Sequence, residues 1–231
     1  MPARPPAATI RTQLTMPLRL SDGYTATARV FSFDGLVDGR EHLAFGLGDR
    51  AGVIPAPGWD GSAPNGSAPN GSVPLVRPHS ECLTGDVLGS QRCDCGPQLR
   101  EAVERIAEHG GFLLYLRQEG RGIGLYAKLD AYALQDAGLD TYQANLALGY
   151  AEDQRDYTVA VQMLHALGLT RVALLSNNPD KAAQLDRLGV TVTEQVPTGL
   201  HLSATNAEYL AAKVRHGGHT LDAPPAWRLT G

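Results

Sequence analysis

Residues 97–125 read PQLREAVERIAEHGGFLLYLRQEGRGIGL, and the order of patterns in this stretch indicates the class of fold. A helical pattern comes first, with apolar side chains recurring at Leu99, Ala102, Val103 and Ile106. Two glycines end this pattern, and the apolar run 112–116 that follows has the length of a buried strand. A glycine-rich loop then leads into another helical pattern. Helix, strand and helix in this order predict an α/β unit.

The same alternation extends through the rest of the chain. We expect further helices over 125–137, 159–167, 179–188 and 204–215, and further strands over 171–176 and 190–196. Nearer the N-terminus, β-branched and aromatic residues alternate over 25–33, and a partner strand is expected near 42–47. The predicted fold class is therefore α/β, as a layered α/β/α arrangement with a mixed sheet and a β-rich N-terminal part.

A low-complexity segment interrupts the N-terminal part. Residues 61–72 repeat a five-residue unit as GSAPNGSAPNGS, which offers no side chains for a core. We therefore predict a flexible loop insertion over 54–74. It would belong to a single domain spanning 16–216, with flexible tails at 1–15 and 217–231.

The composition argues against several classes of protein. The 20 basic and 24 acidic side chains give a formal net charge of -4, which disfavours a dedicated binder of duplex DNA. No apolar run reaches the length of a membrane span, and the N-terminal residues lack the apolar core of a signal peptide, so we expect a cytoplasmic protein. Only three of the basic residues are lysines and none follows a glycine, which excludes a P-loop.

The three cysteines, Cys82, Cys93 and Cys95, lie close together in the sequence. If Cys93 and Cys95 lie in extended chain, their side chains leave the same face, and Cys82 could complete a triangle. Three thiolates form a soft site that favours zinc. The spacing leaves two alternatives open: a closed structural site with His79 as the fourth ligand, and an open catalytic site with water in that position. In the open site, Glu81 is the nearest candidate to move protons.

Two polar turns follow predicted strands, where open α/β sheets bind their ligands. In the first turn, Glu119 could accept from the edge of a base while Arg121 holds phosphate. The second turn places Lys181 at the start of a helix, where an anionic ligand would offset its unfavourable interaction with the helix dipole. Both turns therefore favour an anionic, nucleotide-like ligand.

Taken together, these motifs resemble those of GTP cyclohydrolase II, over roughly residues 24–216. The matching segments are HSECLTGD at 79–86, RCDCG at 92–96, RQEGR at 117–121, AYALQD at 131–136 and SNNP at 176–179. The resemblance implies hydrolysis of GTP to 2,5-diamino-6-(5-phosphoribosylamino)pyrimidin-4-one, formate and pyrophosphate, the first step of riboflavin biosynthesis. It also implies zinc and magnesium as cofactors, and a homodimer with a layered α/β fold.

The resemblance also assigns roles to individual residues. Zinc would be held by Cys82, Cys93 and Cys95, with water in the fourth position, which favours the open site. GTP would contact Arg77, Pro78, His79, Ser80, Glu81, Gln98, Glu119, Gly120, Arg121, Thr141, Ser176 and Lys181. Asp153 would accept a proton, Arg155 would act at the α-phosphate, and Tyr132 would assist at the ring, where the family links it to release of formate. Because arginine stays protonated, we expect Arg155 to stabilise charge rather than attack covalently.

Other functions stay open at this point. A paralogue could open the ring of GTP but retain the formyl group for a specialised pathway, although Tyr132 argues against this. A non-catalytic zinc module could bind nucleotides or single-stranded nucleic acid, but the aromatic content of 6% disfavours stacking on bases. A zinc deaminase and a redox pair are disfavoured, because the Cys-x-x-Cys spacing of both is absent. We therefore expect neither a nucleic acid nor a membrane as partner.

Overall fold

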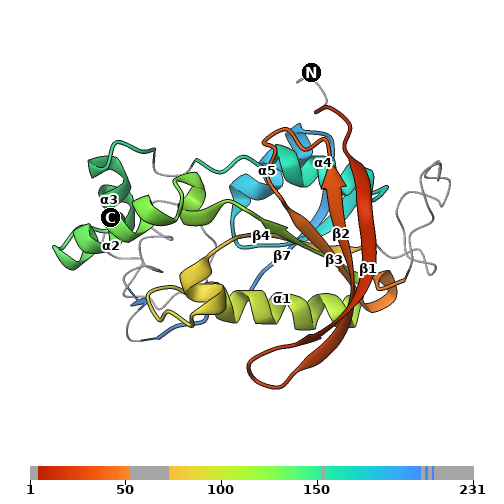
Figure 1. The fold of residues 1–231 in the computed structure, drawn as a ribbon, viewed down its shortest axis with the longest axis horizontal. Helices are drawn as coiled ribbons and strands as arrows, with labels where there is room; N and C mark the ends of the chain where they lie inside the picture. The colour runs from red at the N-terminus through yellow and green to blue at the C-terminus, as the bar shows by residue number, and fades with distance from the viewer. Residues whose placement is uncertain (1–4, 53–72, 152–153, 204–205, 208–209, 211–231) are drawn as a thin grey trace.

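A computed structural model describes residues 5–52, 73–151, 154–203, 206–207 and 210, which form helices around one seven-stranded sheet (Figure 1). The strands lie in the order β1-β2-β3-β5-β4-β6-β7. Their bounds are Thr9–Arg19 (β1), Thr25–Asp34 (β2), Leu43–Leu47 (β3), Leu75–Ser80 (β4), Gly111–Leu116 (β5), Arg171–Leu175 (β6) and Thr191–Val196 (β7). From β1 to β5 in this order the neighbours are antiparallel, and from β5 to β7 they are parallel. The predicted mixed sheet with a β-rich N-terminal part is confirmed.

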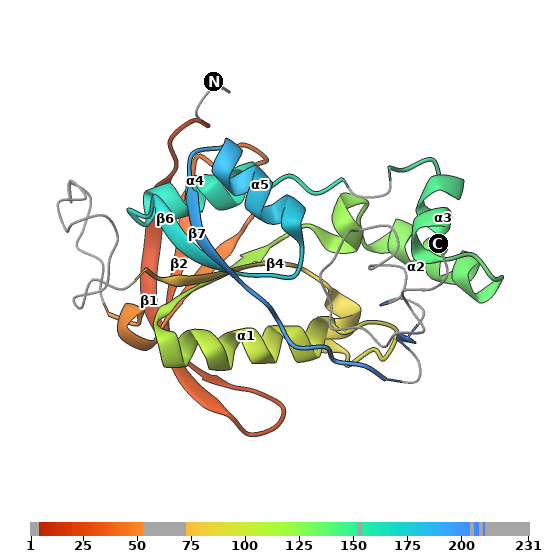
Figure 2. The same ribbon diagram turned by 180° about the vertical axis from the view of Figure 1, so that it is seen from behind.

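Helices cover both faces of this sheet (Figure 2). The helices are α1 (Cys95–His109), α2 (Leu125–Asp136), α3 (Thr141–Ala147), α4 (Thr158–Ala166) and α5 (Pro179–Arg187). The alternation of side chains along β5 explains the layers, because Phe112 and Leu114 pack in one buried cluster with α4, whereas Leu113 packs in another with α1. The predicted layered α/β/α arrangement is confirmed, and α2 and α3 lie beyond one end of the sheet.

The parallel strands β4, β5 and β6 all terminate at the same end of the sheet, where α1 begins; this is called the C-terminal end of the sheet. Polar loops follow all three strands at this end, as in other open α/β sheets that bind ligands there. The start of β4 lies at the opposite end of the sheet. There, Leu75 N–H donates at 3.2 Å to the carbonyl of Gly110, which directly follows α1. Helix α1 has 15 residues and is about 22 Å long, so the two ends of the sheet are about this far apart along the helix.

The structure corrects part of the predicted organisation. The tail expected over 1–15 is wrong from Thr9 onward, because β1 begins there and pairs with β2. This strand is at the edge of the sheet and is mostly exposed, so its apolar pattern is weak. Strand β4 was not expected either, since Pro78 interrupts it and the polar side chains of Arg77 and His79, although buried, break its apolar run.

Several predictions fall on residues outside the described part of the chain. They concern most of the 54–74 loop, most of the 204–215 helix and the whole 217–231 tail. The single domain over 16–216 stays a prediction. Among the residues that the structure describes, no helix is long and apolar enough to cross a membrane.

Candidate functional site

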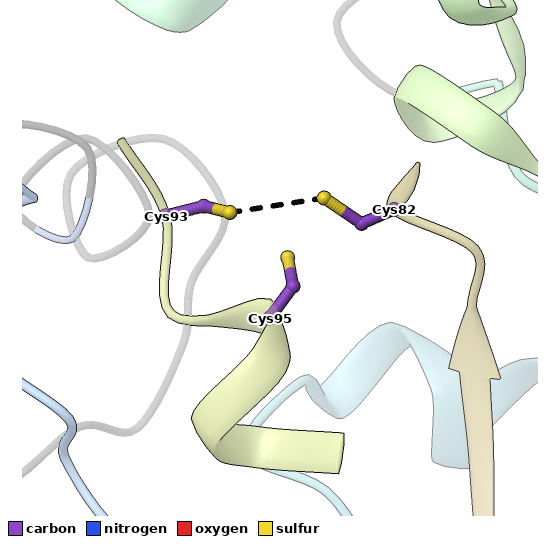
Figure 3. A group of neighbouring side chains, drawn as sticks. All are labelled: Cys82, Cys93 and Cys95. Atoms are coloured by element: carbon purple, nitrogen blue, oxygen red, sulfur yellow. Dashed lines mark hydrogen bonds between the residues drawn. The ribbon is translucent and has the colours of Figure 1, made fainter. Parts of the chain in front are cut away.

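The three cysteines converge at the C-terminal end of the sheet, where β4, β5 and β6 terminate (Figure 3). Cys82 follows β4, Cys93 precedes α1, and Cys95 is the first residue of α1. Their sulfur atoms all lie within 4.8 Å of one another, and Cys82 Sγ and Cys93 Sγ are 3.7 Å apart. Zinc–sulfur bonds of about 2.3 Å in a tetrahedral site separate the sulfurs by about 3.8 Å. The spacing and the soft donor set therefore fit a zinc ion.

His79 is not part of this ligand cluster. Its Nε2 lies 3.1 Å from both carboxylate oxygens of Asp86, and its ring stacks on Tyr115. Burial lowers the pKa of His79 although Asp86 opposes the shift, so the neutral ring donates its Nε2–H to Asp86. Asp86 also accepts from Cys82 N–H and from the Tyr115 hydroxyl, each at 3.0 Å. The structure therefore favours an open site of three cysteines over a closed site that includes His79.

Hydrogen bonding within the cluster separates the pKa values of the three thiols. Hydrogen bonds from Cys93 and Cys95 lower the pKa of Cys82 far below its usual range, against the effect of burial, and Lys128 lowers it further. The same contact with Cys82 raises the pKa of Cys93 to about 11 and also raises that of Cys95. Cys82 is therefore the thiol that loses its proton most readily, and a metal ion bound by all three cysteines would displace their protons.

The cysteines line a cavity together with nearly all of the predicted site residues. Those predicted residues are Arg77, His79, Ser80, Glu81, Gln98, Glu119, Gly120, Arg121, Tyr132, Thr141, Arg155, Ser176 and Lys181. Pro78 is not among the lining residues, but its carbonyl accepts from Lys181 Nζ at 2.9 Å. Asp153 lies outside the described residues. The structure brings these segments together, while the role of each side chain stays a prediction.

Cationic side chains in this cavity are held in fixed positions. The buried guanidinium of Arg77 donates to the carbonyl of Leu175 at 3.0 Å and to Gln98 Oε1 at 2.7 Å. The buried Nζ of Lys181 lies 5.5 Å from the centre of the Tyr157 ring. Because these side chains are already ordered, binding of an anion would cost little further side-chain entropy. The cavity therefore suits a ligand with several phosphate groups.

The loop after β5 combines an unusual backbone with a well-anchored carboxylate. Arg121 has a φ of 60°, in the left-handed region that non-glycine residues rarely adopt, and such residues are concentrated at functional sites. The Glu119 carboxylate accepts from Leu83 N–H at 2.7 Å, from Gly120 N–H at 2.9 Å and from Lys128 Nζ at 2.8 Å. A carboxylate has about four acceptor positions, so Glu119 keeps about one for a ligand.

Several lining residues were not predicted as site residues. They are Arg92, Ile123, Lys128, Ala131, Gln135, Asn145, Asn177, Asn178 and Thr198. Arg92 pairs with Asp136 at 2.8 Å, and its guanidinium lies 5.0 Å from the centre of the Tyr132 ring. Lys128 is four residues before Tyr132 on α2, so a helical projection from Tyr132 would have found it. Thr198 follows β7, and no local signal in the sequence marks it.

The segment after β7 is fastened beside the cavity by Glu101 and Asn177. The Glu101 carboxylate accepts from Gly199 N–H at 2.9 Å and lies 2.8 Å from His201 Nε2. Burial raises the pKa of Glu101, but hydrogen bonds from His201 and Gly199 outweigh it and lower the pKa to about 2. Thr198 N–H donates to Asn177 Oδ1 at 3.0 Å, and Asn177 Nδ2 donates back to the Thr198 carbonyl at 2.9 Å. These contacts fix one wall of the cavity.

Comparison with known proteins finds one matching family model and several similar sequences. Residues 13–197 match the model described as GTP cyclohydrolase II. The chain is 48% identical over 196 residues to the GTP cyclohydrolase-2 of Vibrio parahaemolyticus, covering 84% of this chain and 89% of that protein. It is 44% identical over 217 residues to the GTP cyclohydrolase-2 of Psychromonas ingrahamii, covering 93% and 98%. It is also 50% identical over 196 residues to the riboflavin biosynthesis protein RibBA of Bacillus velezensis, covering 84% of this chain and 45% of that protein.

Proposed function

The chain belongs to the GTP cyclohydrolase II family, and from this premise we propose that it catalyses the first step of riboflavin biosynthesis. It would hydrolyse GTP, open the imidazole ring and release 2,5-diamino-6-(5-phosphoribosylamino)pyrimidin-4-one, formate and pyrophosphate. One observation carries the proposal: the cysteine cluster and the cations Arg77, Arg121, Arg155 and Lys181 line the same cavity. A purine ring and a polyphosphate can therefore be held side by side, each against the groups that its reaction needs.

The base of GTP would lie against the cysteine cluster. Cys82, Cys93 and Cys95 would hold zinc, because their spacing and soft donors fit this ion. Zinc bound there would supply Lewis-acid activation for hydrolysis of the C–N bonds of the imidazole ring. Glu81 and Tyr132 line the cavity with the cysteines, where Glu81 would move protons and Tyr132 would assist the release of formate.

The triphosphate of GTP would lie against the cationic side chains. It would carry Mg²⁺, which prefers phosphate oxygens over dedicated protein cages. Arg77, Arg121 and Lys181 would bind phosphate oxygens, and Arg155 would stabilise the charge that develops as pyrophosphate leaves. Asp153 would accept a proton, the role that the family resemblance implies for it.

We further propose that the protein acts in the cytoplasm as a homodimer, as the family resemblance implies. Light scattering after size-exclusion chromatography tests the oligomeric state. A dimer would have twice the 24.6 kDa mass of the chain, whereas elution at the monomer mass over the micromolar range would contradict it.

Incubation of the zinc-loaded protein with GTP and Mg²⁺ tests the reaction itself. Mass spectrometry of all products should find formate, pyrophosphate and the deformylated pyrimidine in equal amounts. A product that retains the formyl group would replace the proposal by the ring-opening paralogue. Unchanged GTP, with stoichiometric zinc verified, would refute enzymatic hydrolysis. A Cys93→Ser variant serves as the matched control for the metal site and should be inactive.

The role of Arg155 has its own test. An Arg155→Lys variant keeps a positive charge but lacks the guanidinium that a covalent intermediate would need. Electrostatic stabilisation predicts that this variant still releases pyrophosphate, at a reduced rate, and that no guanylylated protein accumulates. Complete loss of pyrophosphate release in a folded variant would favour covalent attack instead.

A further inference from the structure

The ammonium group of Lys128 lies directly against the sulfur of a predicted zinc ligand. Its Nζ is 3.0 Å from Cys82 Sγ and 2.8 Å from Glu119 Oε1, and the side chain is only 12% exposed. Glu119, a predicted GTP contact, accepts from this lysine, but no role proposed above uses the contact between Lys128 and Cys82. A well-shielded cation beside a metal site needs a separate explanation.

The charge of the site supplies that explanation. A zinc ion with a charge of +2 and three thiolates together carry a net charge of −1 at a buried position. Burying an uncompensated charge is costly, and a charge-assisted hydrogen bond is one way to offset that cost. An N–H group that donates to a thiolate also stabilises the sulfur lone pairs, which raises the energy of charge transfer from that sulfur to a bound metal ion.

The protein holds Lys128 in place from two further sides. Glu119 accepts from Lys128 while its carboxylate is itself fixed by the N–H groups of Leu83 and Gly120. The ring of Tyr132 lies on the same helix, with its centre 5.8 Å from Lys128 Nζ, within the range of a cation–π contact. An ordered lysine next to Cys82 indicates a positioned charge rather than a side chain that samples the solvent.

We propose that Lys128 is a positioning residue of the metal centre, whose hydrogen bond to Cys82 offsets the negative charge of zinc bound by three thiolates. The inference rests on the proposed zinc site and extends it to a residue outside the ligand set. Loss of a partner that hydrogen-bonds to a metal ligand typically lowers metal affinity by about 10- to 100-fold. We expect a loss of that size when the ammonium group of Lys128 is removed.

Zinc affinity in the absence of GTP tests this role. A Lys128→Met variant removes the charge and the donors, whereas Lys128→Arg keeps both. Competition with a chromophoric chelator should show about 10- to 100-fold weaker zinc binding by Lys128→Met and a recovery of most of the affinity by Lys128→Arg. With cobalt in place of zinc, the sulfur-to-cobalt charge-transfer band should move to lower energy in Lys128→Met and return in Lys128→Arg.

An Arg187→Met variant is the matched control, because it also removes one positive charge. Arg187 is exposed near the end of α5 and does not line the cavity, so its loss should leave zinc affinity within about twofold of wild type. Affinity of Lys128→Met within the same twofold, or an unshifted cobalt band, would overturn the inference.

Two further measurements separate other causes from this result. Circular dichroism checks that each variant is folded; if Lys128→Met is not, Lys128→Gln replaces it under the same criteria. Failure of the wild-type protein to bind zinc would refute the metal site and the proposed function with it. Equal affinities in all variants, with zinc bound, would refute only the role of Lys128.

Discussion

An alanine at position 85 would place its β-carbon among the three cysteines. Gly85 lies in the turn after Cys82, and the added carbon would be 2.7 Å from Cys93 Sγ, 3.0 Å from Cys82 Sγ and 3.0 Å from Cys95 Cβ. Non-bonded heavy atoms are best separated by about 3.5–4.0 Å. To restore contact at about 3.5 Å, the sulfur of Cys93 would have to withdraw by about 0.8 Å.

A displacement of this size exceeds what a zinc site tolerates, since metal–ligand distances vary by only about 0.2 Å. Inserting a methyl group into a well-packed region costs about 1–3 kcal/mol. If that cost falls entirely on the metal-bound form of Gly85→Ala, zinc affinity drops by about 5- to 150-fold, at 1.4 kcal/mol for each factor of ten. Hydrolysis of GTP at limiting zinc should decline in proportion.

Competition with a chromophoric chelator measures this affinity, and Gly52→Ala provides the control. Within the part of the chain that the structure describes, a β-carbon at Gly52 meets nothing within 4 Å, so this variant should bind zinc as the wild type does. Thermal unfolding in excess chelator shows whether the fold itself tolerates the methyl group at position 85. Zinc affinity of Gly85→Ala within about twofold of Gly52→Ala would refute the inferred crowding of the cysteine cluster.

Three further predictions concern the zinc ion, the hydrogen bonds of Glu101 to the segment after β7, and the buried carboxylate of Asp86. Removal of zinc with a chelator should abolish GTP hydrolysis and expose the cysteines to alkylation, and one equivalent of zinc should reverse both; activity that persists without zinc would contradict this. The depressed pKa of Glu101 should contribute stability above about pH 4.5 that is lost as the pH falls toward 2, so Glu101→Gln should flatten urea-unfolding stability across this window. An unchanged pH dependence would contradict a stabilising role of the hydrogen bonds to Glu101. Asp86→Ala removes the acceptor of Cys82 N–H and of two side chains, and should lower the free energy of unfolding by at least about 1.5–3 kcal/mol; an unchanged denaturation midpoint would show that these bonds are dispensable.

Local patterns predicted the elements whose burial is one-sided or whose ends carry clear signals. Helix α1 begins and ends within a few residues of its predicted bounds, since its apolar period and the Gly110-Gly111 pair are both local. Strand β1 was missed because its side chains face solvent on an outer strand of the sheet, and β4 because Arg77, Pro78 and His79 interrupt its apolar run although they are buried. In both cases the deciding factor is the position in the sheet, which depends on residues far away in sequence.

The candidate site followed the same rule. The cysteine cluster and the loop of Glu119 and Arg121 were predicted because their residues lie close together in sequence motifs. Thr198 lines the cavity next to Asn177, which follows the neighbouring strand β6, and the two residues exchange hydrogen bonds although they are 21 residues apart in the sequence. Lys128 and Cys82 are 46 residues apart, and only the fold places them in contact.

The route by which the chain enters β4 has a practical consequence for engineering. Gly48 and Leu75 both pack near the end of α1, about 22 Å along that helix from Cys95, so the junctions of the repetitive segment lie far from the cavity. Each doubling of the length of a loop costs only about 0.6 kcal/mol in closure entropy. A peptide tag or an immobilisation tether grafted between these junctions should therefore leave the chemistry at the other end of the sheet undisturbed.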